Sequence, residues 1–168
     1  MSVSAEPVIR PAGPEDAERC GEIAVEAWRP IFASWRELLG EELFEAVYGD
    51  WEAVKRGQVV EFLTKWPQMA IVTELEDRVV GFLTYHLWPD KPVAEIGNNA
   101  VAPGHQGLGI GTRQVRHAMG LFRERGVTVA TVMTGLDDGH SPARCMYVNS
   151  GFGPSLPMIR YFGEVQGP

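Results

Sequence analysis

Three glycines at alternate positions join a strand-like segment to a helix-like one. Gly107, Gly109 and Gly111 form this junction. The apolar segment before them covers residues 93–101, and in the segment after them, 111–125, apolar residues recur on one helical face. Glycine lets backbone N–H groups converge, and the first turn of a helix adds unpaired N–H donors and the positive end of its dipole. The pattern therefore predicts a strand–loop–helix unit that can bind a diphosphate.

The glycine spacing narrows the choice of phosphate ligand. Alternate glycines do not match G-x-G-x-x-G, and the Gly-Lys-Ser/Thr ending of a P-loop is missing. No acidic residue stands out at the end of the following strand, where a ribose would bind. A surface loop with accidental glycines is the alternative interpretation, and the strand and helix on either side of the loop argue against it.

Strand-like and helix-like segments follow one another along the chain. Six strands are expected, at 7–10, 70–73, 79–85, 93–101, 127–134 (buried on both faces) and 158–162. Helices are expected at 14–28, at 35–62 with breaks near Gly40, Tyr48–Gly49 and Gly57, at 111–125, and at 141–149. Pro30 should end the first helix, and Ser141 should cap the last one, with Pro142 at its first position. No repeat or linker is visible, so we expect one α/β domain with a mixed sheet.

Composition sets limits on the partners and the compartment. Apolar residues make up 45% of the 168 residues and charged residues 22%, as in soluble globular proteins. No apolar run is long enough to span a membrane, and the polar start of the chain, residues 1–7, does not indicate export. A net charge of −7 argues against a nucleic-acid partner. Cys20 and Cys145 are expected to be buried, reduced thiols in the cytoplasm, although a disulfide is formally possible.

Three segments resemble the GNAT superfamily of acetyl-CoA-dependent N-acetyltransferases. Gln106-x-x-Gly109-x-Gly111 is similar to its Arg/Gln-x-x-Gly-x-Gly/Ala signature, and 94–103 looks like its central strand. Residues 143–152 resemble the family's A-x-x-x-Y-x-x-x-G-F segment. The resemblance runs from about residue 70 to 162.

The resemblance implies both a fold and an activity. The fold would be an α/β (α+β) GNAT-like domain over residues 1–168, with a mixed, mostly antiparallel sheet of about six to seven strands flanked by helices. The activity would be transfer of an acetyl group from acetyl-CoA to a primary amine, on a small molecule or a peptide, by direct attack. Acetyl-CoA and the amine are then the expected partners, without metal, nucleic acid or membrane, and a homodimer is compatible with the resemblance.

The resemblance also assigns site residues. The backbone of Asn99 and Val101 would bond the acetyl carbonyl and the pantetheine amides, where main-chain donors stabilise negative charge on the thioester oxygen. Tyr147 would protonate the departing thiolate. The family often has Asn where this chain has His140, which puts the contact of this residue with CoA in doubt. The remaining positions expected to bind the cofactor are Gln106, Gly107, Leu108, Gly109, Ile110, Gly111 and Thr112.

The attacking ammonium must lose a proton, so a base is needed. Glu95 is the candidate, because some family members have a glutamate base at this strand position and simple alternation would put Glu95 on the same face as Asn99. A solvent-facing glutamate is an equal alternative. Asp137, Asp138 and His140 are competing bases, and each also fits an ordinary polar loop.

The remaining histidines and aromatic residues give weaker indications of function, and two alternative functions are left open. His86, His105 and His117 lack partners at metal-ligand spacing, so no metal site is proposed. Aromatic residues crowd the N-terminal third and could form a wall of the acceptor pocket or simply pack the helices: Trp28, Phe32, Trp35, Tyr48 and Trp51. The alternative functions are a non-catalytic acyl-CoA-binding regulatory domain and, less favoured, a nucleotide-binding module.

Overall fold

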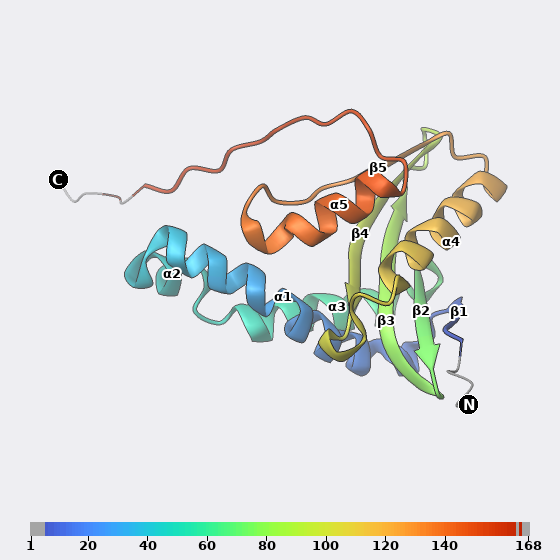
Figure 1. Ribbon diagram of the computed structural model, residues 1–168, viewed down its shortest axis with the longest axis horizontal. Coiled ribbons are helices and arrows are strands. Elements are labelled where there is room, and N and C mark those ends of the chain that lie inside the picture. Colours follow the sequence, from blue (N-terminus) through green and yellow to red (C-terminus); the bar gives the residue numbers. More distant parts are fainter. Residues whose placement is uncertain (1–5, 164, 166–168) are drawn as a thin grey trace.

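A five-stranded sheet forms the centre of the molecule (Figure 1). The computed structural model describes residues 6–163 and 165. The strands lie in chain order: β1 (Val8–Pro11), β2 (Ala70–Leu75), β3 (Arg78–Leu87), β4 (Val93–Val101) and β5 (Val129–Val132). From β1 to β4 each strand is antiparallel to the next, and β5 runs parallel to β4. The mixed, mostly antiparallel sheet is confirmed, but within the described residues it has five strands rather than six to seven.

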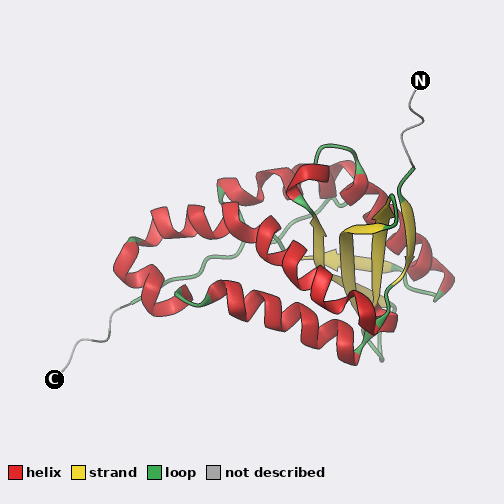
Figure 2. Ribbon diagram, turned by 90° about the horizontal axis from the view of Figure 1, so that it is seen from below, coloured by secondary structure: helices red, strands yellow, loops and turns green. Residues whose placement is uncertain are grey.

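Helices cover both faces of the sheet. On one face, α1 (Ala17–Leu39) and α3 (Trp51–Lys65) bury a core with β2, β3 and β4 that includes Ile23, Leu63 and Phe82. On the other face, α4 (Ile110–Glu124) buries Val115 and Phe122 against the sheet. The short helices α2 (Glu41–Tyr48) and α5 (Ser141–Asn149) complete the layers. In Figure 2 the long helices reach well beyond the edge of the sheet.

The expected end of the first helix at Pro30 was wrong. Helix α1 continues through Pro30 to Leu39, although a proline removes one backbone hydrogen bond inside a helix. Packing on both sides of the proline compensates, because Ala24 and Ile31 are both buried. The break at Gly40 is confirmed, since this residue has a φ of 76° between α1 and α2.

Gly57 lies in the middle of α3, where a helix break was expected. No other part of the structure lies within 4 Å of the position that a Cβ would occupy there. Because glycine in a helix interior costs conformational entropy, we expect Gly57→Ala to raise the free energy of unfolding by about 0.5–1 kcal/mol. Urea unfolding followed by circular dichroism measures this, and a loss of stability would show that the position is more crowded than the structure indicates.

The C-terminal part departs most from expectation. Residues 158–162 form no strand, and the tail from Gly153 to Gly163 has no regular secondary structure. Strand β5 is an edge strand, and Val129 is 51% exposed, so burial on both of its faces was also wrong. Helix α5 begins at Ser141 after the 3-10 turn Asp138–His140, so its N-cap is His140 rather than the expected Ser141.

The two cysteines lie in different environments. Cys20 is buried in α1, and burial raises the pKa of its thiol to about 12. Cys145 is exposed on α5, so the expectation of two buried thiols holds for only one of them. Both thiols are free.

Two further expectations concern the chain as a whole. Residues 1–5, which make up most of the polar start of the chain, lie outside the described residues. Within the described part of the chain, no helix has the length and hydrophobicity needed to cross a membrane.

Candidate active site

A β-bulge in the central strand organises the site. Leu83 of β3 lies opposite Asn99 of β4, and Tyr85 lies opposite Ile96. One residue of β3 therefore faces two of β4, which is the pattern of a bulge. The extra residue reverses the alternation of side chains along β4. As a result, Ile96 and Asn99, an odd number of positions apart, both face α4.

The bulge also marks the point where β4 separates from β5. The parallel pairing ends at Ile96 with Val132, so the second half of β4 has an open edge on that side. The backbone N–H of Ala102 donates to the carbonyl of Val80 on β3 at 2.8 Å. Because backbone groups alternate along an antiparallel strand, the N–H groups of Asn99 and Val101 point away from β3, toward the open edge.

A cavity of about 570 Å³ lies along this open edge. It brings together all of the sequence-predicted site residues except Glu95 and Leu108. The predicted residues on its walls are Asn99, Val101, Gln106, Gly107, Gly109, Ile110, Gly111, Thr112, His140 and Tyr147. The opposite wall comes from α1, the segment after β5 and α5. Its residues include Trp28, Ile31, Thr134 and Met146.

The glycine loop closes one end of the cavity. Gly107 and Gly109 have φ values of 78° and 76°, in the left-handed region that glycine adopts without strain. Nothing lies within 4 Å of the Cβ position of either residue, so the loop presents open backbone at the start of α4. Leu108 is 63% exposed and lies outside the cavity walls. Open N–H groups at a helix N-terminus fit a diphosphate.

The side chains of Gln106 and His105 in this loop lie in positions that the sequence did not predict. The side-chain amide of Gln106 turns back and donates to the carbonyl of Val101 at 2.9 Å, so it braces the loop against β4. His105 also lines the cavity, and its buried Nδ1 has no hydrogen-bond partner among the described residues. A polar ligand in the cavity could satisfy this atom.

Tyr147 lies on α5 across the cavity from β4. Its side chain is 8% exposed, and its ring packs edge-on against Phe152 at 5.5 Å between centroids. Burial raises the pKa of Tyr147 to about 12, and the nearby side chain of Asn99 offsets part of this rise. The phenol therefore stays protonated at neutral pH, as a proton donor must.

Glu95 lies on the other face of the sheet. It pairs with His86, whose ring contacts Phe62 of α3, whereas its neighbours Ala94 and Ile96 pack on the α4 side. The expected common face with Asn99 was therefore wrong, because the bulge lies between them. Glu95 is half-buried, and its role as a base stays a prediction.

Gln114 is a residue that sequence reasoning missed. It is fully buried on α4, and its Oε1 accepts a hydrogen bond from the Thr73 hydroxyl at 2.8 Å. Its Nε2 donates to the carbonyl of Phe82 at 3.1 Å and to Oδ1 of Asn99 at 2.5 Å. One amide thus ties α4 to three strands and fixes the side chain of Asn99. The sequence did contain a signal, because Gln114 lies four residues before Ala118 and is therefore a polar residue on the apolar face of the helix.

Replacing Gln114 with leucine is expected to lower the free energy of unfolding by about 2–3 kcal/mol. The apolar side chain leaves the Thr73 hydroxyl, the Phe82 carbonyl and the Asn99 amide without their buried partner. Urea unfolding measures the change, with Gln58→Leu on the exposed side of α3 as control. A loss below about 0.5 kcal/mol, the size of ordinary surface changes, would contradict this role.

The aromatic residues of the N-terminal third mainly pack on one another. Phe32 stacks on Trp51 at 4.1 Å between centroids and contacts Trp35 and Tyr48 edge-on. Of the five expected wall residues, Trp28 lines the cavity. The helix-packing interpretation thus fits the other four best.

Lys55 of α3 packs against Trp28 and was not among the residues expected at the site. Its ammonium lies 3.8 Å from the centre of the Trp28 ring and donates to Oδ1 of Asn98 at 2.7 Å. Burial lowers the pKa of Lys55 to about 8. Lys55 thus links the Trp28 ring of α1 to Asn98 at the bulge of β4.

Carboxylates, histidines and cysteines do not gather into a metal-binding group. Across the part of the chain that the structure describes, no three of them lie close enough to hold an ion.

Comparison with known proteins gives the family. A family model described as the acetyltransferase (GNAT) family matches residues 26–152. No curated protein matches the sequence significantly. The structure resembles PaiA N-acetyltransferase from Thermoplasma acidophilum, solved with coenzyme A, at a TM-score of 0.69 and 18% identity over 88% of this chain and 90% of that one.

Two further solved structures are similar. A GNAT family acetyltransferase from Brucella melitensis, solved with acetyl-CoA, has a TM-score of 0.59 and 21% identity over 91% of this chain and 92% of that one. An aminoglycoside acetyltransferase from an uncultured soil metagenomic sample, solved with sisomicin, has a TM-score of 0.57 and 19% identity over 95% and 97%. These likenesses show the fold, and the family model covers more than half of the chain. The chain belongs to the GNAT family of acetyltransferases.

Proposed function

We propose that this acetyltransferase transfers the acetyl group of acetyl-CoA to a primary amine by direct attack. The observation that carries the proposal is the convergence on one cavity of the open glycine loop, the free edge of β4 and the buried Tyr147. A diphosphate fits the loop, an extended amide-containing arm fits a free strand edge, and a neutral phenol fits a departing thiolate.

Each group has a role in the proposed reaction. The N–H groups of Asn99 and Val101 polarise the thioester carbonyl and bond the pantetheine arm. The loop from Gln106 to Thr112 binds the diphosphate of CoA, and Gly111 keeps the cavity open beside Met146, whose sulfur lies 3.1 Å from the Cβ position. Tyr147 gives its proton to the sulfur as the carbon–sulfur bond breaks. A base must also take a proton from the ammonium, and Glu95, the base expected from the sequence, lies on the opposite face of the sheet from Asn99.

The choice of an amine as acceptor rests on chemistry and on one similar structure. The solved relative with sisomicin is named as an aminoglycoside acetyltransferase. A net charge of −7 also favours cationic acceptors and disfavours nucleic acid. We extend the proposal to a cytoplasmic setting, in which the exposed thiol of Cys145 stays reduced.

The proposal is tested by coupling calorimetry to a CoA-release assay. Calorimetry should show that acetyl-CoA binds. The release of CoA should then increase when at least one of three amines is added: a diamine, an amino sugar or a peptide with a free N-terminus. Acetylated product is identified by mass spectrometry. Binding without turnover of any amine would contradict amine transfer, and no binding at millimolar acetyl-CoA would contradict the cofactor.

A further inference from the structure

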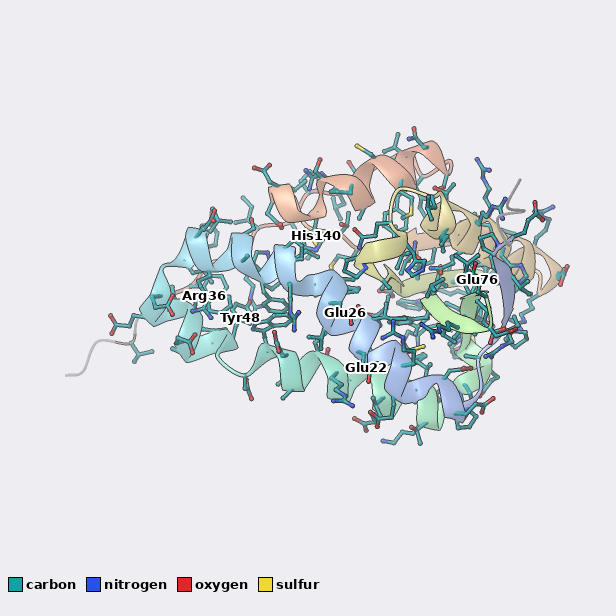
Figure 3. All side chains as sticks on the ribbon, turned by 60° about the horizontal axis from the view of Figure 1, so that its bottom comes forward. Glu22, Glu26, Arg36, Tyr48, Glu76 and His140 are labelled. Carbon is teal, nitrogen blue, oxygen red and sulfur yellow. The ribbon has the colours of Figure 1, made fainter. Side chains whose placement is uncertain are left out.

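A histidine–aspartate pair lies on the wall of the cavity. His140 lines the cavity between α1 and α5, where Figure 3 labels it, and its side chain is 14% exposed. Its Nδ1 lies 2.7 Å from Oδ1 of Asp137, whose side chain is 9% exposed. A contact of His140 with CoA was in doubt because the family often has Asn at this position, and the pairing with Asp137 suggests different chemistry.

The pair is held on several sides. The indole N–H of Trp35 donates to Oδ1 of Asp137 at 3.3 Å, and the Trp35 ring lies 6.1 Å from the imidazole. Arg144 of α5 donates to the backbone carbonyls of Gly135 and Asp137, both at 2.7 Å. A Cβ on Gly135 would lie 2.4 Å from Oδ1 of Asp137 and 2.5 Å from Nδ1 of His140, so the close packing requires glycine there.

The hydrogen bonds set the protonation of the pair. Burial raises the pKa of Asp137, but hydrogen bonds from His140 and Trp35 outweigh it, and the net effect is a lowered pKa. An ionised Asp137 accepts the Nδ1–H of a neutral imidazole and leaves Nε2 with its lone pair. Asp137 is the charged group that contacts the ring, Arg144 of α5 binds the backbone carbonyl of Asp137, and α1 contributes the neutral Trp35.

From this geometry we propose that Nε2 of His140 is the base that deprotonates the acceptor ammonium, and that Asp137 is its positioning residue. The inference rests on the proposed function. It is distinct from a CoA contact by an asparagine amide, because a neutral ring with its N–H directed to Asp137 can only accept a hydrogen bond. An ammonium is a donor and matches that acceptor. A pantetheine amide N–H also matches, and the binding measurement below separates the two.

The proton transfers balance. His140 takes one proton from the ammonium, and the neutral nitrogen then forms its bond to the acetyl carbon. As the carbon–sulfur bond breaks, Tyr147 gives its proton to the sulfur. The nitrogen loses its second proton through water to the Tyr147 oxygen, which restores the phenol, and the imidazolium releases its proton to solvent.

The kinetic test compares His140→Asn with wild type at saturating acetyl-CoA. Asparagine keeps the residue that the family often has at this position, so we expect the Kd for acetyl-CoA to change less than about threefold and kcat to fall about 100-fold. Without the base, the variant must use amine that is already neutral in solution, so its kcat should rise with pH toward the pKa of the amine. The wild-type kcat should not follow the pKa of the amine in this way. Asp137→Asn should lower kcat about tenfold, through a poorly oriented ring.

Two surface variants serve as matched controls. His117→Gln removes an exposed histidine of α4, and Asp90→Asn removes an exposed carboxylate of the loop before β4. Both should match wild type. The proposal is overturned if His140→Asn keeps the wild-type pH profile, or if it weakens acetyl-CoA binding by as much as it lowers kcat. It is also overturned if Glu95→Gln, rather than His140→Asn, makes kcat follow the pKa of the amine.

A spectroscopic measurement decides the protonation state without turnover. In the acetyl-CoA complex at neutral pH, ¹⁵N NMR of the imidazole should show the Nδ1–H tautomer. An Nε2–H ring or a doubly protonated ring overturns the proposal. If wild type acetylates no amine of the panel, the proposed function fails, and the tautomer still decides whether His140 offers a free Nε2.

Discussion

Replacing Tyr147 with phenylalanine is expected to lower kcat about 100-fold while the Kd for acetyl-CoA stays within about threefold of wild type. The phenol is buried and its pKa is raised to about 12, so it carries its proton throughout the practical pH range. Phenylalanine keeps the ring and its contact with Phe152, and only the hydroxyl is lost. Steady-state kinetics and calorimetry on the same preparations give the two quantities.

Tyr161→Phe is the matched control, because the Tyr161 side chain is 87% exposed on the C-terminal tail. It should behave as wild type. If Tyr147→Phe weakens acetyl-CoA binding as much as it lowers kcat, the hydroxyl serves binding and not proton transfer. A loss of thermal stability similar to that of a core deletion would point instead to a packing role.

Gly109→Val is expected to raise the Kd for acetyl-CoA about 100-fold, which corresponds to about 2.7 kcal/mol. A β-branched side chain is strained at the φ of 76° that Gly109 adopts at the start of α4. The added methyl groups would also cover the open backbone that faces the cavity. Calorimetry with CoA measures the effect, and circular dichroism checks that α4 remains folded.

Gly104→Ala is the control in the same loop, at a glycine that does not have a left-handed φ. No atom lies within 4 Å of the Cβ position of Gly104, and its φ is not in the left-handed region. The Kd should therefore change little. Equal losses in both variants would mean that any change in the loop disturbs binding, and the specific requirement at Gly109 would be refuted.

The elements with strong local signals were predictable from the sequence. The hairpin of β2 and β3, the strand β4 and the amphipathic α4 lie within a few residues of expectation, because each combines a clear period with a turn or glycine at its end. The glycine loop was predictable for the same reason. Its position between β4 and α4 follows from adjacent residues alone.

The errors arose where distant contacts decide the structure. Pro30 does not end α1, because buried residues on both sides hold the helix together. Residues 158–162 have the composition of a strand, but no neighbouring strand lies beside them in the described structure. A strand needs a partner, and the sequence of one segment does not say whether the partner is present.

The site shows the same division. Asn99 and Tyr147 line one cavity as the motifs suggested, but Glu95 lies on the far face because a one-residue bulge separates it from Asn99. Bulges depend on the register between two strands, which single-sequence periodicity does not contain. The position of Asp137 beside His140 likewise involves a distant residue, because Trp35, about a hundred residues away in sequence, donates a hydrogen bond to Asp137.

The position of the N-terminal helices has a consequence for how such proteins can diverge. The chain leaves the sheet after Pro11, passes through α1, α2 and α3, and returns in β2, which pairs directly with β1. Residues 12–69 thus form a helical cassette whose two ends are held side by side by the pairing of β1 with β2. Lengthening such a segment costs little extra loop-closure entropy. The cassette supplies Trp28 and Ile31 to one cavity wall, while the loop at Gly109 belongs to the other half of the chain. Evolution can therefore replace the cassette, and with it the α1 wall of the cavity, without changing the glycine loop that is proposed to bind the diphosphate.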